Sequence, residues 1–477
     1  MSNLDTIATM PFACIAIGAL MFLLLDIFRE DVKPFPRVFW GVGISLSTAF
    51  LCWPFARLNE SAFGGMLAVD PYSFIFMVII LVGTAITFLL GDEQQEGQKI
   101  SKSVDVDILI LMASLGGMVM VSATNLILLF VGFELLSISV YVLAGLAKFE
   151  RASSESAMKY FILGAFSSAF LLYGMALVYG ATGSMQLVEI GQAVSSPSTM
   201  LLVGIGLMIF GFGFKVSLVP FHFWTPDVYH GAPSGVSAYM AVVVKAAAFG
   251  TFFRIMATAF GGIQESWATI IVVLSILSMT YGNLVALRQK SIKRMLAYSS
   301  IAHAGYALIA FLVDGDALIF YMIVYALMTF GSFGVVLLAT SGSDAQYDKD
   351  DVKSLEGIGW THPLLGISMT IAMLSLSGIP PLAGFMGKFY LFSEALSKGY
   401  VALVVVAAIN SVISLYYYLR VIVVMYFSGE RTLEWSPSKN LVLGPRFALM
   451  FVTFGTIYLG LFSGRYVEFA KLAANSF

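Results

Sequence analysis

Stretches of about twenty apolar residues recur from one end of this chain to the other. A helix of that length crosses the hydrocarbon core of a membrane, where every backbone polar group must find its partner inside the protein. The stretches predict fourteen spanning helices, at 7–28, 38–56, 72–91, 106–123, 126–146, 156–180, 201–221, 233–256, 266–287, 295–312, 317–339, 363–395, 400–426 and 446–464. We therefore predict an all-α polytopic membrane protein, with residues 1–477 forming a single transmembrane domain.

The composition supports this prediction. Hydrophobic residues make up 59% of the chain and charged residues 11%, whereas an ordinary soluble domain is about 25% charged. The formal net charge of −2 gives no indication of nucleic-acid binding. Cys14 and Cys52 both fall in apolar stretches, and we interpret them as small hydrophobic side chains instead of a disulfide or a metal pair.

The charges of the loops predict the orientation. One set of loops carries sixteen basic residues: Arg29, Lys33, Arg37, Lys99, Lys102, Lys148, Arg151, Arg288, Lys290, Lys293, Arg294, Lys349, Lys353, Arg431, Lys439 and Arg446. The segments on the other side carry four: Arg57, Lys398, Arg465 and Lys471. Cytoplasmic loops are enriched in lysine and arginine, so both termini are predicted to face the periplasm or its equivalent.

Six of the 26 basic residues belong to no loop: Lys159, Lys215, Lys245, Arg254, Lys388 and Arg420. Near the end of a span a long cationic side chain can reach the headgroups, so Arg254 and Arg420 are interpreted as interfacial or structurally paired. Lys159 is compatible with an interfacial or a functional role. The three other lysines lie at least about two turns inside their spans, where a charge costs roughly 2.5–3.5 kcal/mol. We predict that these three face the interior of the bundle.

Two further titratable residues lie within spans. Glu134 is in the middle of the span 126–146, where a carboxylate stays ionised only if a cation is near. His303, in "MLAYSSIAHAGYALIAF", could shuttle protons because histidine titrates near physiological pH, although a packing role is equally compatible. His222, His230 and His362 lie at span edges or in loops, and their spacing does not indicate a metal site.

Proline and glycine interrupt two of the predicted spans. Lys215 is followed by Pro220 and "FHFWTPDVYHGAPSG", and the span 363–395 contains "SGIPPLAG" just before Lys388. A pair of interrupted helices in corresponding places of two halves points to an ion path near the membrane midplane. The interrupted spans are the seventh and the twelfth, which predicts two five-helix repeats, 105–256 and 257–427, the second inverted. Residues 1–104 and 428–477 flank them.

Three segments resemble a known family: "FGFKVSLVPFHFWTPDVYHGAPSGVSAYM", "ALRQKSIKRMLAYSSIAHAGY" and "LSLSGIPPLAGFMGKFYLF". They are similar to the antiporter-like membrane subunits of proton-pumping NADH:quinone oxidoreductase, respiratory complex I, and the similarity extends over nearly the whole chain. The resemblance implies fourteen helices, two inverted repeats with broken seventh and twelfth helices, and a central hydrophilic axis. The positions of this sequence that match the axis are Glu134 and Lys159 as a glutamate–lysine pair, Lys215 in the broken helix, Lys245 as a connecting lysine, His303 at the centre and Lys388 in the second half. Lys388 and the short segment after Gly464 resemble the shortest of three paralogous subunits.

The resemblance implies a proton-translocating subunit of the bacterial inner membrane, driven by electron transfer from NADH to quinone in partner subunits. The sequence has no nucleotide-binding loop, haem motif or iron–sulfur cysteines. We therefore expect no cofactor and no redox site in this chain, and expect NADH, FMN, iron–sulfur clusters and quinone in its partners, which include antiporter-like paralogues. Two alternatives are a subunit of a multi-subunit sodium/proton antiporter and a membrane scaffold; the buried lysines argue against the scaffold.

Overall fold

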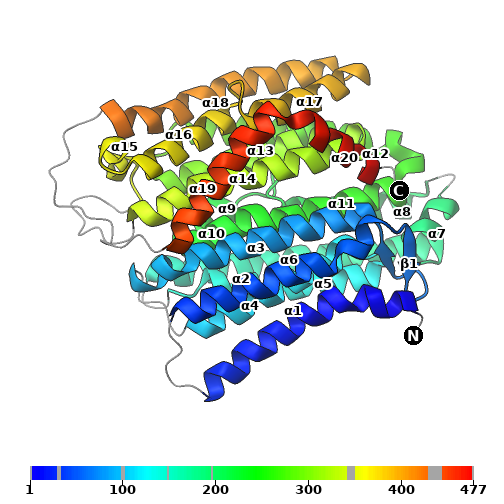
Figure 1. Ribbon diagram of the computed structural model, residues 1–477. Coiled ribbons are helices and arrows are strands. Elements are labelled where there is room, and N and C mark those ends of the chain that lie inside the picture. Colours follow the sequence, from blue (N-terminus) through cyan, green and yellow to red (C-terminus); the bar gives the residue numbers. More distant parts are fainter. Residues whose placement is uncertain are drawn as a thin grey trace.

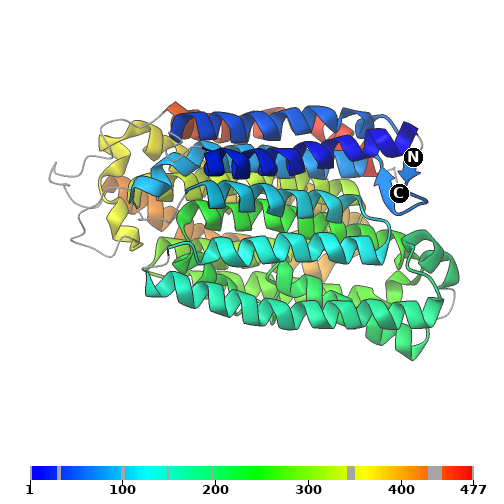
Figure 2. The same cartoon turned by 90° about the horizontal axis from the view of Figure 1, so that it is seen from below.

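The computed structural model describes residues 3–28, 34–97, 103–147, 150–194, 197–340, 350–427 and 443–474. Most of these residues are helical, and the long helices lie side by side in one bundle (Figure 1). The same arrangement is seen from below in Figure 2. The expected all-α polytopic membrane protein is confirmed.

Within the described ranges, twelve helical segments are long and apolar enough to cross a membrane. They are α1 (Asn3–Phe28), α2 (Pro34–Leu51), α3 (Pro71–Gly97), α4 (Ser103–Ser122), α5 (Leu126–Ala144), α6 (Arg151–Thr182), the run of α10 (Ser234–Tyr239), η2 (Met240–Val244) and α11 (Lys245–Thr258), α12 (Gln264–Ala286), α13 (Ile292–Ile309), α14 (Gly315–Thr340), α18 (Val401–Phe427) and α19 (Leu443–Leu461). Two shorter apolar helices, α8 (Thr199–Lys215) and α16 (Pro363–Ser377), lie in the predicted seventh and twelfth spans.

The remaining elements connect or flank these helices. They are α7 (Leu187–Ala193), α9 (Thr225–Gly231), α15 (Ile358–Thr361), α17 (Ala383–Ser397) and α20 (Ser463–Ala474), the 3-10 turns η1 (Trp53–Ala56), η3 (Gly261–Ile263), η4 (Ala310–Leu312) and η5 (Val352–Leu355), and the antiparallel strands β1 (Glu60–Ala62) and β2 (Leu67–Val69). The β1–β2 hairpin marks one end of the bundle, called the hairpin end, and α15 marks the opposite α15 end (Figure 1). Helix α1 begins and α20 ends at the hairpin end.

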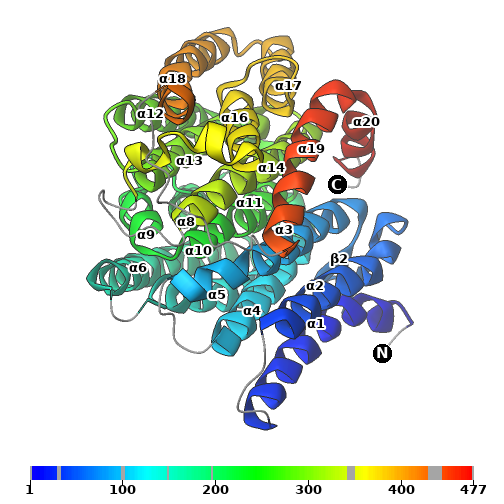
Figure 3. The same ribbon diagram turned by 60° about the vertical axis from the view of Figure 1, so that its left-hand side comes forward.

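The most buried helices carry two residues of the predicted site, Lys245 and His303. In the most apolar part of the run Ser234–Thr258, 100% of the residues are buried. The corresponding share is 94% for Ile292–Leu312 and 33% for Val401–Phe427. Viewed along the bundle, α11, α13 and α14 lie between α1–α6 on one side and α16–α18 on the other (Figure 3). A polar side chain on these central helices must therefore find its partners inside the protein.

Local sequence explains where several helices begin. The first N–H groups of a helix have no intrahelical acceptor, and a short polar side chain just before the helix can supply one. Asn125 Oδ1 accepts from Ile127 N at 2.9 Å before α5. The hydroxyls of Ser198 and Ser291 do the same for α8 and α13, at 3.2 and 3.3 Å.

The end of α16 depends on two glycines. Gly378 ends the helix with φ of 86°, a left-handed conformation that disfavours side chains. A Cβ added to Gly384 would lie 1.7 Å from Ser375 O. Glycine is therefore needed for α17 to pack this closely against α16, and the close packing directs Lys388 toward the end of α16.

Arg254 and Arg420, which the sequence left as interfacial or structurally paired, both have structural partners. Arg254 on α11 forms a bidentate pair with Asp70, with Nη–Oδ distances of 2.8 and 3.0 Å. Arg420 on α18 donates to the carbonyl oxygens of Leu287 and Gln289, just after α12, at 3.3 and 2.6 Å. Basic side chains commonly bind the last carbonyls of a helix in this way.

Several basic residues used to predict the orientation lie outside the described residues, in the segments 29–33, 98–102, 148–149, 341–349 and 428–442. Arg37, which was counted with the loops, lies inside α2. Its Nε donates to Asp107 Oδ2 on α4 at 2.7 Å, and both side chains are buried.

We expect Arg254→Met to destabilise the chain strongly, because it leaves the Asp70 carboxylate buried without its guanidinium partner. Breaking a buried pair from one side costs about 3–5 kcal/mol. The measurements are the amount of the chain assembled in membranes and the thermal unfolding midpoint of the purified complex. A second variant, Arg254→Met with Asp70→Asn, removes both charges and should recover much of the loss. A single variant as stable as the parent would contradict this structural role.

Candidate functional site

Lys215 lies where α8 ends. The next turn contains Ser217 with φ of 67°, a conformation that is strained for any residue but glycine, and Pro220 follows. The helix cannot continue through this segment, and Lys215 becomes its last residue. The side chain is only 1% exposed.

Aromatic rings and one hydroxyl surround the Lys215 ammonium group. Its Nζ donates to Ser137 Oγ on α5 at 2.7 Å. The rings of Phe133, Tyr141 and Tyr160 have their centroids 5.0, 5.6 and 5.8 Å from Nζ. Cation–π contacts of this kind stabilise an ammonium group but do not accept its proton.

Glu134 is the carboxylate that acts on Lys215. It lies on α5, three residues before Ser137, and interacts electrostatically with the lysine. Its Oε1 is buried and has no hydrogen-bond partner among the described residues. The structure thus places the predicted glutamate beside the lysine of the broken span.

Lys159 lies near the α15 end and is paired with other carboxylates. Its side chain is 40% exposed, and Nζ lies 2.7 Å from Glu155 Oε1 on the same helix and 2.7 Å from Asp227 Oδ2 on α9. The ion pairs of the described residues include none that joins Lys159 to Glu134. The two residues that the resemblance pairs are therefore not in direct contact in this conformation.

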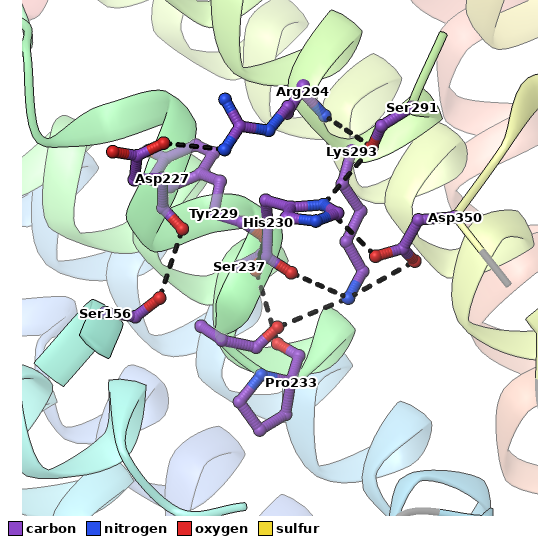
Figure 4. Close-up of polar contacts among 11 residues, drawn as sticks. Ser156, Asp227, Tyr229, His230, Pro233, Ser237, Ser291, Lys293, Arg294 and Asp350 are labelled. Atoms are coloured by element: carbon purple, nitrogen blue, oxygen red, sulfur yellow. Dashed lines mark hydrogen bonds and ion pairs between the residues drawn. The ribbon is translucent and has the colours of Figure 1, made fainter. Parts of the chain in front are cut away.

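Asp227 was missed in the sequence, where it is one acidic residue of the segment after the break. Its other oxygen accepts from Arg294 Nη2 of α13 at 2.7 Å (Figure 4). Burial raises the pKa of the Asp227 carboxyl, but Lys159 and Arg294 outweigh this effect and hold the pKa below its usual value. Asp227 is therefore a carboxylate at neutral pH and joins α6, α9 and α13.

A second polar group lies beside Asp227 at the α15 end. His230 Nδ1 is 3.2 Å from Asp350 Oδ2, and Lys293 Nζ is 3.5 Å from Asp350 Oδ1. Lys293 also donates to the carbonyls of His230 and Ala232, at 3.4 and 3.3 Å. These contacts tie α9 to the start of α13 (Figure 4). His230 thus has a definite polar environment instead of the unassigned loop position that its sequence suggested.

Lys245 lies in the fully buried run at the centre of the bundle. The π-helical turn η2 immediately precedes it, a feature often found at functional sites. Its Nζ donates to Ser300 O at 2.8 Å and to Ser300 Oγ at 2.5 Å. The Ser300 hydroxyl also bonds the Tyr325 hydroxyl at 2.8 Å. The hydrogen-bond acceptors of Lys245 are therefore neutral oxygen atoms.

His303 follows one helical turn after Ser300 on α13. Its Nδ1 is 2.7 Å from the Tyr321 hydroxyl and its Nε2 is 3.2 Å from the Tyr418 hydroxyl. Both Lys245 and Lys388 interact with it electrostatically. His303 thus lies among tyrosine hydroxyls inside the bundle, and its role at the centre of the axis stays a prediction.

Lys388 on α17 is held by the end of α16. Its Nζ donates to the carbonyls of Leu376 and Ser377, at 3.0 and 3.2 Å, and to Ser411 Oγ on α18 at 3.0 Å. The last carbonyls of a helix lack intrahelical partners and carry its partial negative charge. The break after α16 therefore makes these acceptors available to the lysine.

The structure places five of the six predicted residues in two groups inside the bundle. Lys245, His303 and Lys388 interact in sequence, Lys215 and Glu134 form a second group, and Lys159 stands apart with Asp227 at the α15 end. Among the described residues, no group of three or more His, Cys, Asp or Glu side chains is placed to hold a metal ion. Buried lysines and a histidine that contact neutral oxygen atoms inside a membrane bundle are typical of an ion-translocating membrane protein.

Comparison with known families specifies this class. Residues 123–414 match the model of the family described as "NADH:quinone oxidoreductase/Mrp antiporter, TM". The chain is 42% identical to the NADH-quinone oxidoreductase subunit N of Trichlorobacter lovleyi, over 99% of this chain and 97% of the relative. The chain belongs to the NADH:quinone oxidoreductase/Mrp antiporter membrane family.

Two solved structures have the same fold. A chain of respiratory complex I from Thermus thermophilus with bound aureothin is 35% identical, with a TM-score of 0.83 over 97% of this chain and 99% of that chain. A chain of the Mrp complex from Dietzia sp. DQ12-45-1b has a TM-score of 0.84 over 99% of this chain and 97% of that chain. The latter is 20% identical and supports the fold alone.

Proposed function

We propose that this chain is a proton-translocating membrane subunit of an NADH:quinone oxidoreductase, respiratory complex I, of the subunit N type. The observation that carries the proposal is the buried series Lys245–His303–Lys388, together with Lys215 and Glu134. The relative named subunit N and the complex I chain support the assignment. The chain takes part in the reaction as a non-redox subunit of a translocase, and NADH, FMN, iron–sulfur clusters and quinone belong to its partners.

In the proposed mechanism, Lys215 receives and holds a proton while Glu134 stabilises its charge. A change in the surroundings of Glu134 or in the Lys159–Asp227 pair alters the field at Lys215, and the proton moves on. Lys245 and His303 pass it across the centre of the bundle to Lys388. Burial penalises each charge and neutral oxygens compensate only part of that penalty, so these groups can release protons. The groups titrate as a coupled set.

We further propose that fourteen crossings contain two inverted five-helix repeats, 105–256 and 257–427, with breaks in the seventh and twelfth. The end of α8 at Lys215 and the gap between α16 and α17 support this division. Each break lies beside one lysine of the axis. The other membrane subunits of complex I, including antiporter-like paralogues, are the proposed partners in a bacterial inner membrane.

A subunit of a multi-subunit sodium/proton antiporter is the second candidate, and the shared fold of the Mrp chain favours it. The lysines of the axis favour H⁺ over Na⁺ as the transported ion. Their ammonium groups repel Na⁺, and hard metal cations prefer clustered oxygen ligands. The test is affinity purification of the tagged chain from its own membranes. Co-purification of NADH:quinone oxidoreductase activity that acidifies vesicles without added Na⁺ supports the proposal. Sodium-dependent transport by a complex without NADH oxidation would replace it with the second candidate.

We expect both termini to face the periplasm. A periplasmic reporter fused after Phe477 should be active, whereas the same reporter inserted in the segment 288–291 should be silent, because this basic segment belongs to the cytoplasmic side. A cytoplasmic reporter at the two positions provides the matched control and should give the opposite result. The reverse pattern would overturn the orientation.

A further inference from the structure

Two buried tyrosine hydroxyls lie between the Lys215 and Lys245 groups without a hydrogen-bond partner among the described residues. They belong to Tyr160 on α6 and Tyr229 on α9, and both side chains are 0% exposed. A buried hydroxyl left unpaired costs about 1–3 kcal/mol, so native structures retain few of them. The two hydroxyls therefore call for a function or for bound water.

Their neighbours form a continuous series from one lysine to the other. The Tyr160 ring lies 5.8 Å from Lys215 Nζ. Tyr160 and Tyr229 both pack against the Trp224 ring, with centroid distances of 4.3 and 6.0 Å. Tyr325 bonds the Ser300 hydroxyl that accepts from Lys245.

The last gap in this series lies between the Tyr229 hydroxyl and the Ser300 hydroxyl. The Ser300 side chain is close enough to influence the Tyr229 hydroxyl, yet the two do not form a hydrogen bond of normal length and geometry. A small rotation of either hydroxyl-bearing side chain, or one water molecule, would join them. Tyr229 is thus placed to reach the Lys245 group from the side of Lys215.

Packing holds the two tyrosines in this position. Tyr160 stacks on Trp224 with ring centroids 4.3 Å apart, and Trp224 Nε1 donates to Phe214 O, next to Lys215, at 2.9 Å. The Tyr229 backbone carbonyl accepts from Ser237 Oγ at 2.8 Å (Figure 4). Both rings pack against Trp224 and the Tyr229 backbone is fixed, while the hydroxyl hydrogens remain free to turn.

We propose that Tyr229, with Tyr160 before it, relays protons from Lys215 to Lys245 through water molecules bound at the two hydroxyls. This inference rests on the proposed function. In each transfer the Lys215 ammonium group loses one N–H bond to an adjacent oxygen, each hydroxyl accepts one proton and passes its own forward, and the Lys245 amine gains one N–H bond. The hydroxyls then turn back, so one proton enters the series, one leaves it, and no electron is exchanged.

The test is Tyr229→Phe in the assembled complex. The variant removes a hydroxyl that has no hydrogen-bond partner among the described residues, so assembly and thermal stability should be unchanged or slightly higher. Proton pumping and coupled NADH:quinone turnover should fall about tenfold, because a positioned proton-transfer group is lost. The H₂O/D₂O ratio of the turnover rate should rise, since proton transfer then limits the rate. Tyr160→Phe should change pumping in the same direction.

Tyr239→Phe is the matched control. Tyr239 is also 0% exposed, but its hydroxyl bonds Ser114 Oγ at 2.8 Å and Ile110 O at 3.2 Å, away from the series of lysines. Its loss removes two buried hydrogen bonds, so stability should fall while the isotope ratio stays at the parent value. The two variants should thus shift stability and transport in different ways.

Normal pumping and a normal isotope ratio in Tyr229→Phe and Tyr160→Phe would overturn the relay. If Lys215→Ala nevertheless loses pumping in the same preparation, the lysine axis stands and only the relay is wrong. If Lys215→Ala also pumps normally, the proposed function itself fails and the relay fails with it.

Discussion

Lys215→Ala is expected to leave the complex assembled but to lower proton pumping and coupled NADH:quinone turnover by about tenfold or more. Among the described residues, the ammonium group donates to Ser137, contacts aromatic rings and has no carboxylate within ion-pair distance. Removing the ammonium group therefore breaks no direct ion pair with a carboxylate. We expect transport to fall more than the stability of the complex. Turnover and vesicle acidification are measured at equal amounts of assembled complex.

Lys215→Arg distinguishes a proton carrier from a fixed positive charge. Arginine keeps the charge but does not release its proton in proteins, so a carrier role predicts that this variant is also inactive. Lys290→Ala, at an exposed lysine of the α15 end, controls for loss of a cation. Normal pumping by an assembled Lys215→Ala complex would exclude the proposed role of Lys215. An active Lys215→Arg complex would mean that Lys215 acts only as a fixed positive charge.

Glu134→Gln is expected to lose most of the activity, and Glu134→Asp to keep part of it. Glutamine has nearly the same volume but no charge with which to stabilise a proton on Lys215. Aspartate keeps the charge and is one methylene shorter. A packing role predicts the opposite order, because the isosteric amide would be tolerated and the smaller aspartate would leave a void. Proton uptake and turnover are compared for both variants at equal assembly.

A double-mutant cycle identifies the partner of Glu134. In the structure, Glu134 interacts electrostatically with Lys215, whereas Lys159 forms ion pairs with Asp227 and Glu155. We therefore expect the effects of Glu134→Gln and Lys215→Ala to be strongly non-additive. A larger coupling with Lys159 would mean that the working complex rearranges the Lys159–Asp227 pair. Higher activity of the glutamine variant than of the aspartate variant would end the electrostatic interpretation.

The sequence by itself determined the membrane class, the positions of twelve of the fourteen predicted spans and the lysines that must be buried. These features can be predicted from the sequence because their physical causes are local. The length of an apolar run reflects the thickness of the hydrocarbon core, and the cost of a charge depends on its depth in the run. The proline pair in "SGIPPLAG" likewise acts locally, because proline lacks the backbone N–H that a helix needs.

The identity of the partners was decided only by the tertiary structure. Arg254 meets Asp70 across 184 residues, Lys159 meets Asp227 across 68, and His303 meets Tyr418 across 115. No local pattern encodes contacts between segments so far apart. The acceptors of Lys245 and Lys388 are backbone carbonyls and serine hydroxyls, which occur throughout any chain and become a site only when helix packing and a helix end bring them to a buried cation.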